Sequence, residues 1–307
     1  SFQTVEISPN LSIVTDLLPG KNDEVDIESS VRRIDAFTKR ILDTLSNKKL
    51  LVLKKDYTKN PIFGVGQLPF LNPFPDEFIY ETKFMKAYLA SYLNELFSIN
   101  KRKDHWITGG IQTYLMMQYV EEFYPGSKFL GDLHRFKILG IRPFYSYSAA
   151  NIGFNESFSF IAEFGEHGNR QQQDTLGKER LTKINELYAI PYHVGAGLNY
   201  LGNYLGDDVL ANSIKSFSKS RGRVPLKNIL AENTDKETEW FFDTYLTDRE
   251  AYDLSIKRLI KGQESIRLTV SEKNSKPVPF KLDLIKDDQL ILEKWIEHSG
   301  RDTIIEL

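Results

Sequence analysis

Hydrophobic and polar positions change their spacing along this chain. Between about residue 26 and residue 246, apolar residues recur mostly every third or fourth position, which predicts helices. From about residue 250 onward, apolar and polar residues alternate, which predicts strands. We therefore expect a mainly helical first part followed by an antiparallel β-structure.

The clearest amphipathic helix is predicted between residues 26 and 45. Asp26 is a suitable N-cap for it. Its apolar stripe has helical spacing and consists of Ile27, Val31, Ile34, Phe37, Ile41 and Leu45. Two longer helices are predicted over residues 76–98 and 104–124, the second ending at Pro125-Gly126. Several short helices are expected over residues 181–246, one through Leu187 and another from Val194 to Leu205.

Strands are predicted near both ends of the chain. Residues 2–18 alternate loosely and suggest one or two strands, and the apolar run 49–54 between lysines suggests a short buried strand. Residues 60–75 contain four prolines, which exclude a helix there. After residue 250, turn signals separate the alternating segments, so an antiparallel sheet or small sandwich is expected.

Composition limits the function classes. The chain has 307 residues, enough for two domains, and its 41% hydrophobic and 27% charged residues are typical of a soluble globular protein. A net charge of -2 gives no reason to expect nucleic acid or an anionic membrane as a partner. The chain has no Cys, so disulfides and thiolate chemistry are excluded.

Targeting signals are not evident in the sequence. No apolar run approaches the roughly 20 residues of a membrane span, and the first residues show no signal peptide. The chain begins with Ser1, which suggests a processed protein or part of a longer one.

Four segments together resemble the aminopeptidase N family of zinc metallopeptidases. Trp106–Tyr114 is similar to the family's Trp-Leu-x-Glu-Gly-x-Ala-x-Tyr segment. The predicted helix 26–45, the strand 49–54 and Pro61–Gln67 resemble the run that leads into its Gly-Ala-Met-Glu-Asn strand, with which residues 64–68 can be aligned. Pro191–Gly195 is similar to its Tyr-x-x-Gly segment, and Thr234–Phe242 to its last catalytic-domain helix. The segments occur in the family's order and span nearly the whole chain.

The resemblance implies an α+β fold with two domains. Residues 1–246 would form a thermolysin-like (gluzincin-type) mixed sheet with a helical subdomain. Residues 247–307 would form a small antiparallel, immunoglobulin-like β domain. About 55 residues give four or five strands rather than seven, so a partial sandwich is expected.

The family's zinc site is degenerate in this sequence. Counting back from Trp106 places the His-Glu-x-x-His segment, which supplies two zinc ligands and the general base, on residues 86–90. Lys86 and Ala90 stand at the two histidine positions, and Ala87 stands at the position of the base. Gly109 stands at the third ligand, a Glu. No histidine precedes His105, so no shift in register supplies the pair, and zinc is expected to be absent.

Other site positions are mixed. The resemblance places the family's amine-anchoring Glu at Gln67, which lacks the negative charge. Tyr192 matches the tyrosine that stabilises the tetrahedral intermediate in the family, although a structural tyrosine at a helix start is the alternative. His193 beside it has no predicted partner. The candidate residues of a substrate groove are Gly64, Val65, Gly66, Gln67 and Tyr192.

Three hypotheses about function follow. The first is a pseudoenzyme that retains the aminopeptidase-like scaffold and binds a peptide or protein, without nucleic acid and without a membrane span. The second is a hydrolase with metal-independent chemistry that uses Tyr192, Lys86 and either Glu81 or Glu95. The third is an unrelated α+β domain, which would lack a helix pair beneath a mixed sheet. By resemblance alone, a cell-envelope or periplasmic location is expected.

Overall fold

A computed structural model describes residues 2–46, 49–65, 73–131, 152–164, 171–248, 252–262, 265–298 and 300–307. Gly66 and Gln67, two of the groove candidates, lie outside these ranges. None of the helices in the described ranges combines the length and hydrophobicity needed to span a bilayer.

A mixed sheet forms the N-terminal edge of the molecule. Its strands are β1 (Gln3–Ser8), β2 (Leu11–Thr15) and β3 (Lys49–Val52). β2 pairs antiparallel with β1 and parallel with β3, so β2 is central. The expected strands are confirmed, but the prediction that residues 49–54 form a buried strand is wrong in part. β3 lies at the edge of the sheet, and Leu51 on its open face is 49% exposed.

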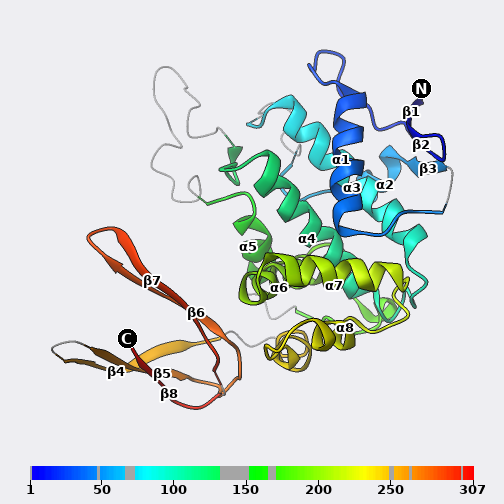
Figure 1. The fold of residues 1–307 in the computed structure, drawn as a ribbon. Coiled ribbons are helices and arrows are strands. Elements are labelled where there is room, and N and C mark those ends of the chain that lie inside the picture. Colours follow the sequence, from blue (N-terminus) through cyan, green and yellow to red (C-terminus); the bar gives the residue numbers. More distant parts are fainter. Residues whose placement is uncertain are drawn as a thin grey trace, which may run out of the picture.

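Between the N-terminal sheet and the C-terminal strands, the chain is mostly helical. Its helices are α1 (Ile27–Ile41), α2 (Lys54–Lys59), α3 (Asp76–Leu96), α4 (His105–Phe123), α5 (Glu156–Phe164), α6 (Ile190–Leu205), α7 (Asp207–Lys219) and α8 (Leu226–Asn233). Two π-helices accompany them, η5 (Asn185–Ala189) and η6 (Phe241–Tyr245). In Figure 1 the sheet lies beside α1, α2 and α3, and α6, α7 and α8 lie toward the opposite side.

The predicted helices form for local reasons. The Asp26 side chain accepts a hydrogen bond from the backbone N–H of Ser29, which caps α1, and Val31 and Ile34 face the core. Several details differ from prediction. α1 ends at Ile41, before the predicted end at residue 45. α2 was not expected, because its polar sequence buries Tyr57 alone. α6 begins at Ile190 rather than Val194, because η5 continues directly into it and Pro191 is tolerated in a first turn.

The backbones of α4 and α6 approach each other closely where the two helices cross, because a glycine lies on each helix at the crossing. A Cβ atom added to Gly110 would lie 2.2 Å from Val194 Cγ1, and one added to Gly195 would lie 2.4 Å from Thr113 Cβ. Only a residue without a side chain fits at these two positions. The crossing brings the start of α4 against the start of α6, where the resemblance places Gly109 and Tyr192.

The C-terminal part is an antiparallel β-structure, as predicted. Its strands are β4 (Leu254–Lys261), β5 (Ile266–Glu272), β6 (Phe280–Lys286), β7 (Gln289–Ile296) and β8 (Thr303–Glu306). They form one sheet in the order β4-β5-β8 and a separate β6-β7 hairpin. A small core lies between them and consists of Leu268, Val270, Phe280, Ile296 and Ile305. The outer ends stay open: Ile256 on β4 is 61% exposed and Ile285 on β6 is 64% exposed.

The β-structure contacts the helices mainly through α6. The Tyr200 hydroxyl donates a hydrogen bond to the Pro279 carbonyl (2.7 Å), and the Tyr204 hydroxyl donates one to Glu297 Oε1 (2.9 Å). The Trp295 ring packs edge-on against both tyrosines, with centroid distances of 5.2 and 5.5 Å. The strands therefore attach to the helical part through a small group of aromatic rings. The β-structure itself lies at the lower left of Figure 1.

Candidate functional site

The positions that the resemblance assigns to the zinc ligands lie on α3 and α4. The Gln112 side chain on α4 donates a hydrogen bond to the Lys86 carbonyl on α3 (2.7 Å), which holds the two helices together at this level. Lys86 and Ala87 are buried, whereas Ala90 is exposed. The structure therefore contains the predicted helix pair beside a mixed sheet, but only two of the three α3 positions face its interior.

Lys86 is the unusual residue of this site. It is 2% exposed, and its amino group has no hydrogen-bond partner among the described residues. Its Nζ atom lies 5.8 Å from the centroid of the Tyr192 ring, within range of a cation–π interaction. Burial lowers the pKa of Lys86 to about 8, because the charged form loses its hydration. A substantial fraction of the amine is therefore neutral near physiological pH.

Gly109 occupies a position where no side chain fits without movement. A Cβ atom added there would lie 3.0 Å from Pro191 Cγ and 3.1 Å from Pro191 Cβ. Pro191 thus fills the space next to the place where the family carries its third ligand. A Glu at residue 109 would require Pro191, and with it the start of α6, to shift.

The residues at these positions do not fit a zinc ion. Zinc binds imidazole, thiolate or carboxylate groups, and Lys86, Ala87, Ala90 and Gly109 supply none of them. Across the described ranges, no cluster of three or more His, Cys, Asp or Glu side chains has an arrangement that could hold a metal ion. His134 and His167 lie outside those ranges.

Tyr192 is buried at the first turn of α6. It is 1% exposed, and its hydroxyl accepts a hydrogen bond from the backbone N–H of Phe63 (3.2 Å). Its ring packs edge-on against Phe158 and Tyr188. Burial raises the pKa of Tyr192 well above its usual value, so the hydroxyl stays protonated. These contacts are those of a packed tyrosine, the alternative considered for it from the sequence.

The loop before α3 lies against Tyr192. Gly64 has a φ of 84°, a left-handed conformation that favours glycine, and Val65 is buried. The Phe63 ring is 46% exposed and lies edge-on to Tyr188, with centroids 6.1 Å apart. Three of the groove candidates, Gly64, Val65 and Tyr192, are therefore close together in the structure.

Glu81 and Glu95, the carboxylates considered for metal-independent chemistry, do not form a hydrogen bond with Lys86. Glu81 is fully buried and accepts hydrogen bonds from the hydroxyls of Tyr119 (2.5 Å) and Tyr124 (2.7 Å), and it also pairs with Arg33. Glu95 is exposed near the end of α3. Of the four residues considered for that chemistry, the structure brings together only Lys86 and Tyr192.

His193 has a partner that the sequence did not indicate. Its Nδ1 atom lies 2.8 Å from Oδ2 of Asp174, whose side chain is fully buried. Its ring stacks on Tyr245 with centroids 4.2 Å apart, and the Tyr245 hydroxyl donates a hydrogen bond to the His193 carbonyl (2.9 Å). His193 is thus a hydrogen-bonded, packed histidine. Asp174 comes from a polar tract with no periodic pattern, so spacing alone could not predict the contact.

Solved structures with a similar fold were found by comparison with known proteins. No protein-family model and no curated protein matches the sequence. Aminopeptidase A of Legionella pneumophila, solved with aspartic acid, matches with a TM-score of 0.65 and 12% identity, over 100% of this chain and 35% of that one. A mutant two-domain M1 zinc metallopeptidase bound to L-tryptophan matches with a TM-score of 0.50 and 11% identity, over 82% of this chain and 52% of the other.

These matches support an aminopeptidase-like fold. The chain spans about a third to a half of the length of the two solved structures. The match over the whole chain, together with the helix pair formed by α3 and α4, speaks against an unrelated α+β domain. At this level of identity the likeness concerns the fold, and the activity of the neighbours does not follow from it.

Proposed function

We propose that this chain is a non-catalytic relative of the zinc aminopeptidases that binds a peptide or an extended protein segment. The observation that carries the proposal is the chemistry at the ligand positions. Lys86, Ala87, Ala90 and Gly109 supply none of the imidazole, thiolate or carboxylate groups that bind zinc in proteins, and Pro191 fills the space beside Gly109. The aminopeptidase-like fold is consistent with a chain that retains a peptide-binding groove without the zinc ligands and the general base.

The peptide site would lie beside the loop of residues 61–65. The exposed Phe63 ring, which lies against Tyr188, offers an aromatic surface for an apolar peptide side chain. Gln67, aligned with the family's amine anchor, carries no charge to pair with a free amino terminus. Recognition would then rest on side chains and backbone rather than on the amino group.

Calorimetric titration with zinc and with short peptides tests the proposal. We expect no tight zinc binding, and we expect micromolar to millimolar binding of apolar peptides that changes little on N-acetylation. Phe63→Ala should weaken peptide binding, whereas Val224→Ala, at an exposed site before α8, should not. Tight binding of one zinc ion per chain would overturn the non-catalytic role, and a panel without any binding peptide would overturn the binding role.

A second candidate is metal-independent hydrolysis. It is favoured by one observation, the buried amine of Lys86 with its pKa of about 8, since a neutral amine can act as a base or nucleophile. Aminoacyl anilides would be the substrates to test, in the presence of a chelator. A rate that persists with chelator and disappears in Lys86→Met would support this candidate over the first, and absence of any rate would remove it.

A further inference from the structure

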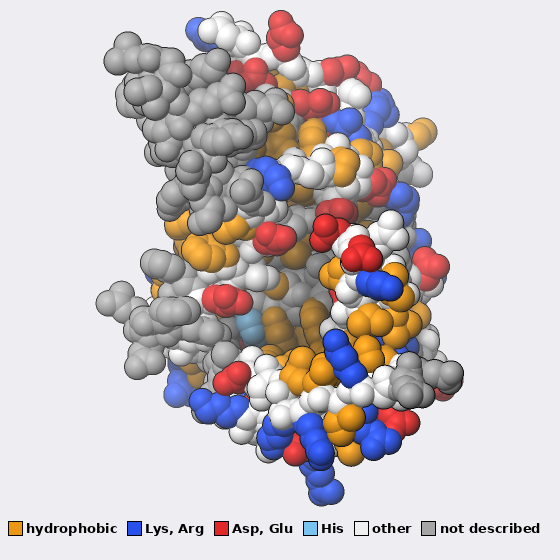
Figure 2. Space-filling view, turned by 90° about the vertical axis from the view of Figure 1, so that its left-hand side faces the viewer, with side chains coloured by type: hydrophobic (Ala, Val, Ile, Leu, Met, Phe, Trp, Pro, Cys, Tyr) orange, Lys and Arg blue, Asp and Glu red, His pale blue; other side chains and the backbone are white. Residues whose placement is uncertain are grey.

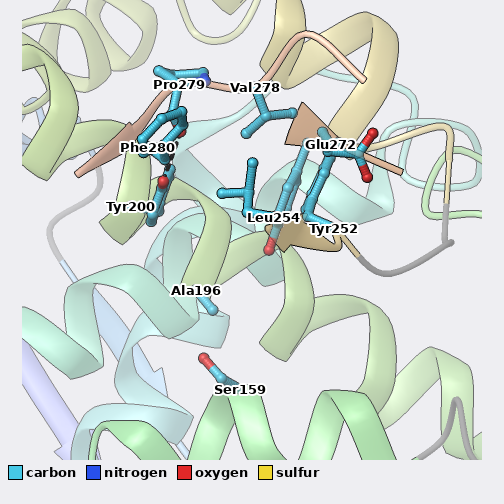
Figure 3. A pocket seen from close by; sticks show the side chains of 10 residues that line it. Ser159, Ala196, Tyr200, Tyr252, Leu254, Glu272, Val278, Pro279 and Phe280 are labelled. Atoms are coloured by element: carbon cyan, nitrogen blue, oxygen red, sulfur yellow. Dashed lines mark hydrogen bonds between the residues drawn. The ribbon is translucent and has the colours of Figure 1, made fainter. Parts of the chain in front are cut away.

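A cavity lies between the helical part and the β-structure, about 320 Å³ in volume. From the helical part it is lined by Ala196, Tyr200 and Tyr245, and from the β-structure by Tyr252, Leu254 and Phe280. Figure 3 shows the labelled side chains around this space, with Ala196 and Ser159 on the side of the helices. Neither Lys86, Gly109 nor Tyr192 lines it, so the cavity is separate from the site described above.

The walls of the cavity suit an apolar and aromatic ligand. Four of its lining side chains are aromatic rings, and Leu254 and Val278 add aliphatic surface. The hydroxyls of Tyr200 and Tyr245 already donate hydrogen bonds, to the Pro279 and His193 carbonyls. On the molecular face shown in Figure 2, hydrophobic side chains gather around a hollow near the centre, while Lys and Arg gather at the lower edge.

The described residues that line the cavity offer no counter-charge to an anion. Neither Lys nor Arg is among the described residues that line the cavity. Glu272 lines it, but its carboxylate accepts hydrogen bonds from the backbone N–H groups of Asp253 (3.2 Å) and Lys276 (2.8 Å). In Figure 3 that carboxylate points away from Tyr200 and Phe280. An anion would meet this negative charge, and a cation in the middle of the cavity would lose its hydration without a carboxylate turned toward it (Figure 3).

One polar group of the cavity wall has no hydrogen-bond partner among the described residues. The Tyr252 hydroxyl is buried and makes no hydrogen bond with the described residues. Its ring lies nearly parallel to that of Tyr245, with an interplanar angle of 9° and a centroid distance of 6.5 Å, and the Lys276 amino group lies 5.2 Å from its centroid. A buried hydroxyl without a partner costs free energy, and a ligand that bonds to it recovers that cost.

We propose that this cavity binds a small neutral aromatic molecule with one hydrogen-bonding group, of the size of a phenol or an indole. Its ring would pack among Tyr200, Tyr245 and Phe280, and its polar group would bond to the Tyr252 hydroxyl. The volume lies at the lower end of the range of about 300–1,000 Å³ that is usual for ligand sites, which restricts the occupant to a small molecule. The inference goes beyond the proposed peptide site and does not depend on it.

Ligand-observed NMR titration of the full chain with p-cresol and with toluene tests the proposal, since the two probes differ by the hydroxyl. We expect p-cresol to bind more tightly than toluene. In Tyr252→Phe the affinity for p-cresol should fall about 5- to 10-fold while that for toluene is unchanged, as expected for loss of one hydrogen bond. Ala196→Phe, which fills the cavity, should abolish binding of both probes.

Leu290→Ser is the matched control. Leu290 lies on β7, is 55% exposed and does not line the cavity, so this variant should bind both probes like the unchanged chain. Circular dichroism verifies that each variant is folded, and Tyr252→Phe carries the test if Ala196→Phe does not fold. Absence of binding at millimolar p-cresol would overturn the proposal. Equal affinity of p-cresol for Tyr252→Phe and the unchanged chain would overturn it as well.

Discussion

The amino group of Lys86 is buried where the resemblance places a zinc-binding histidine. A buried amine without a partner lowers the stability of the folded state, because its charged form prefers water. The identity of the residue at this position was readable from the sequence, since the spacing from Trp106 pointed to it. The burial of the Lys86 side chain and its distance from Tyr192 could not be predicted from the sequence, because both depend on how α3 packs against α6.

Lys86→Met should stabilise the protein in a pH-dependent way. The folded pKa of about 8 lies below that of an unfolded lysine, so folding displaces a proton between about pH 8 and pH 10.5. The penalty is therefore complete below pH 8 and disappears as the pH rises past 10.5. We expect a gain of about 3 kcal/mol at pH 7 that shrinks toward zero at pH 10.5, measured by urea unfolding.

Lys103→Met is the control for this prediction. Lys103 is exposed, so removing its charge should change stability by less than about 0.5 kcal/mol at pH 7. A gain for Lys86→Met that stays constant from pH 7 to pH 10.5 would show that packing, rather than the charge, is responsible.

Glu81 holds a buried polar cluster that joins α1, α3 and α4. Glu81→Ala leaves two tyrosine hydroxyls and part of the Arg33 guanidinium without their acceptor, so we expect a loss of about 3–5 kcal/mol. Glu77→Ala is the matched control. Glu77 also pairs with Arg33 at 2.6 Å, but its side chain is 50% exposed, so a loss below about 1 kcal/mol is expected. Similar losses in both variants, measured by urea unfolding, would contradict this account.

At the scale of elements, the crossing of α4 and α6 determines the packing around Gly109 and Tyr192. Gly→Ala in a helix normally adds about 1 kcal/mol of stability. At Gly110, however, the new Cβ would lie 2.2 Å from Val194 Cγ1, so we expect a net loss of about 1–3 kcal/mol in urea unfolding. Val194→Ala in the same chain should recover part of it, because it removes the clashing methyl groups.

Gly202→Ala serves as the control on α6. Its nearest neighbour would be the flexible end of Leu210, at 3.1 Å, so a change near zero is expected. If Gly110→Ala proved as stable as the unchanged chain, the helices could separate at little cost. In that case the packing of Pro191 against Gly109 would no longer argue against a restored ligand.

Periodicity predicted α1 and the strands after residue 250 because each has one apolar face. α4 differs, because its residues 110–117 are all buried, so its sequence is apolar around the whole helix rather than on one face. α2 was missed because only Tyr57 is buried in it, and tertiary contacts rather than pattern stabilise it. The π-helix η5 was missed because its extra residue per turn has no signature in the sequence.

At the scale of the whole molecule, the β-structure has its own small core and attaches to α6 through Trp295. Trp295→Ala removes the ring that meets both Tyr200 and Tyr204. We expect the β-structure to open more readily, by about 1–3 kcal/mol, with faster amide hydrogen exchange in β5 and unchanged exchange in α4. Lys294→Ala, at the exposed neighbouring position, should alter neither. Equal acceleration in β5 and α4 would indicate a single cooperative unit.

The candidate sites differ in how far the sequence could reveal them. The positions that the resemblance assigns to the zinc ligands lie on α3 and α4, two segments that were predicted as helices. The cavity beside Tyr252 draws on α5, α6, η6 and the β-strands, and no segment of it has a distinctive pattern. The cavity forms where the β-structure packs against α6, and that packing could not be predicted from the sequence.

The measurement that tests the central claim most directly is the metal content of the purified chain after dialysis against zinc, by elemental mass spectrometry. Our account predicts substoichiometric zinc, because Lys86, Ala87, Ala90 and Gly109 provide no ligand. One firmly held zinc ion per chain would contradict it, because ligands from elsewhere in the chain would then have to converge on a metal site. Metal-dependent hydrolysis would then replace the non-catalytic role as the leading hypothesis.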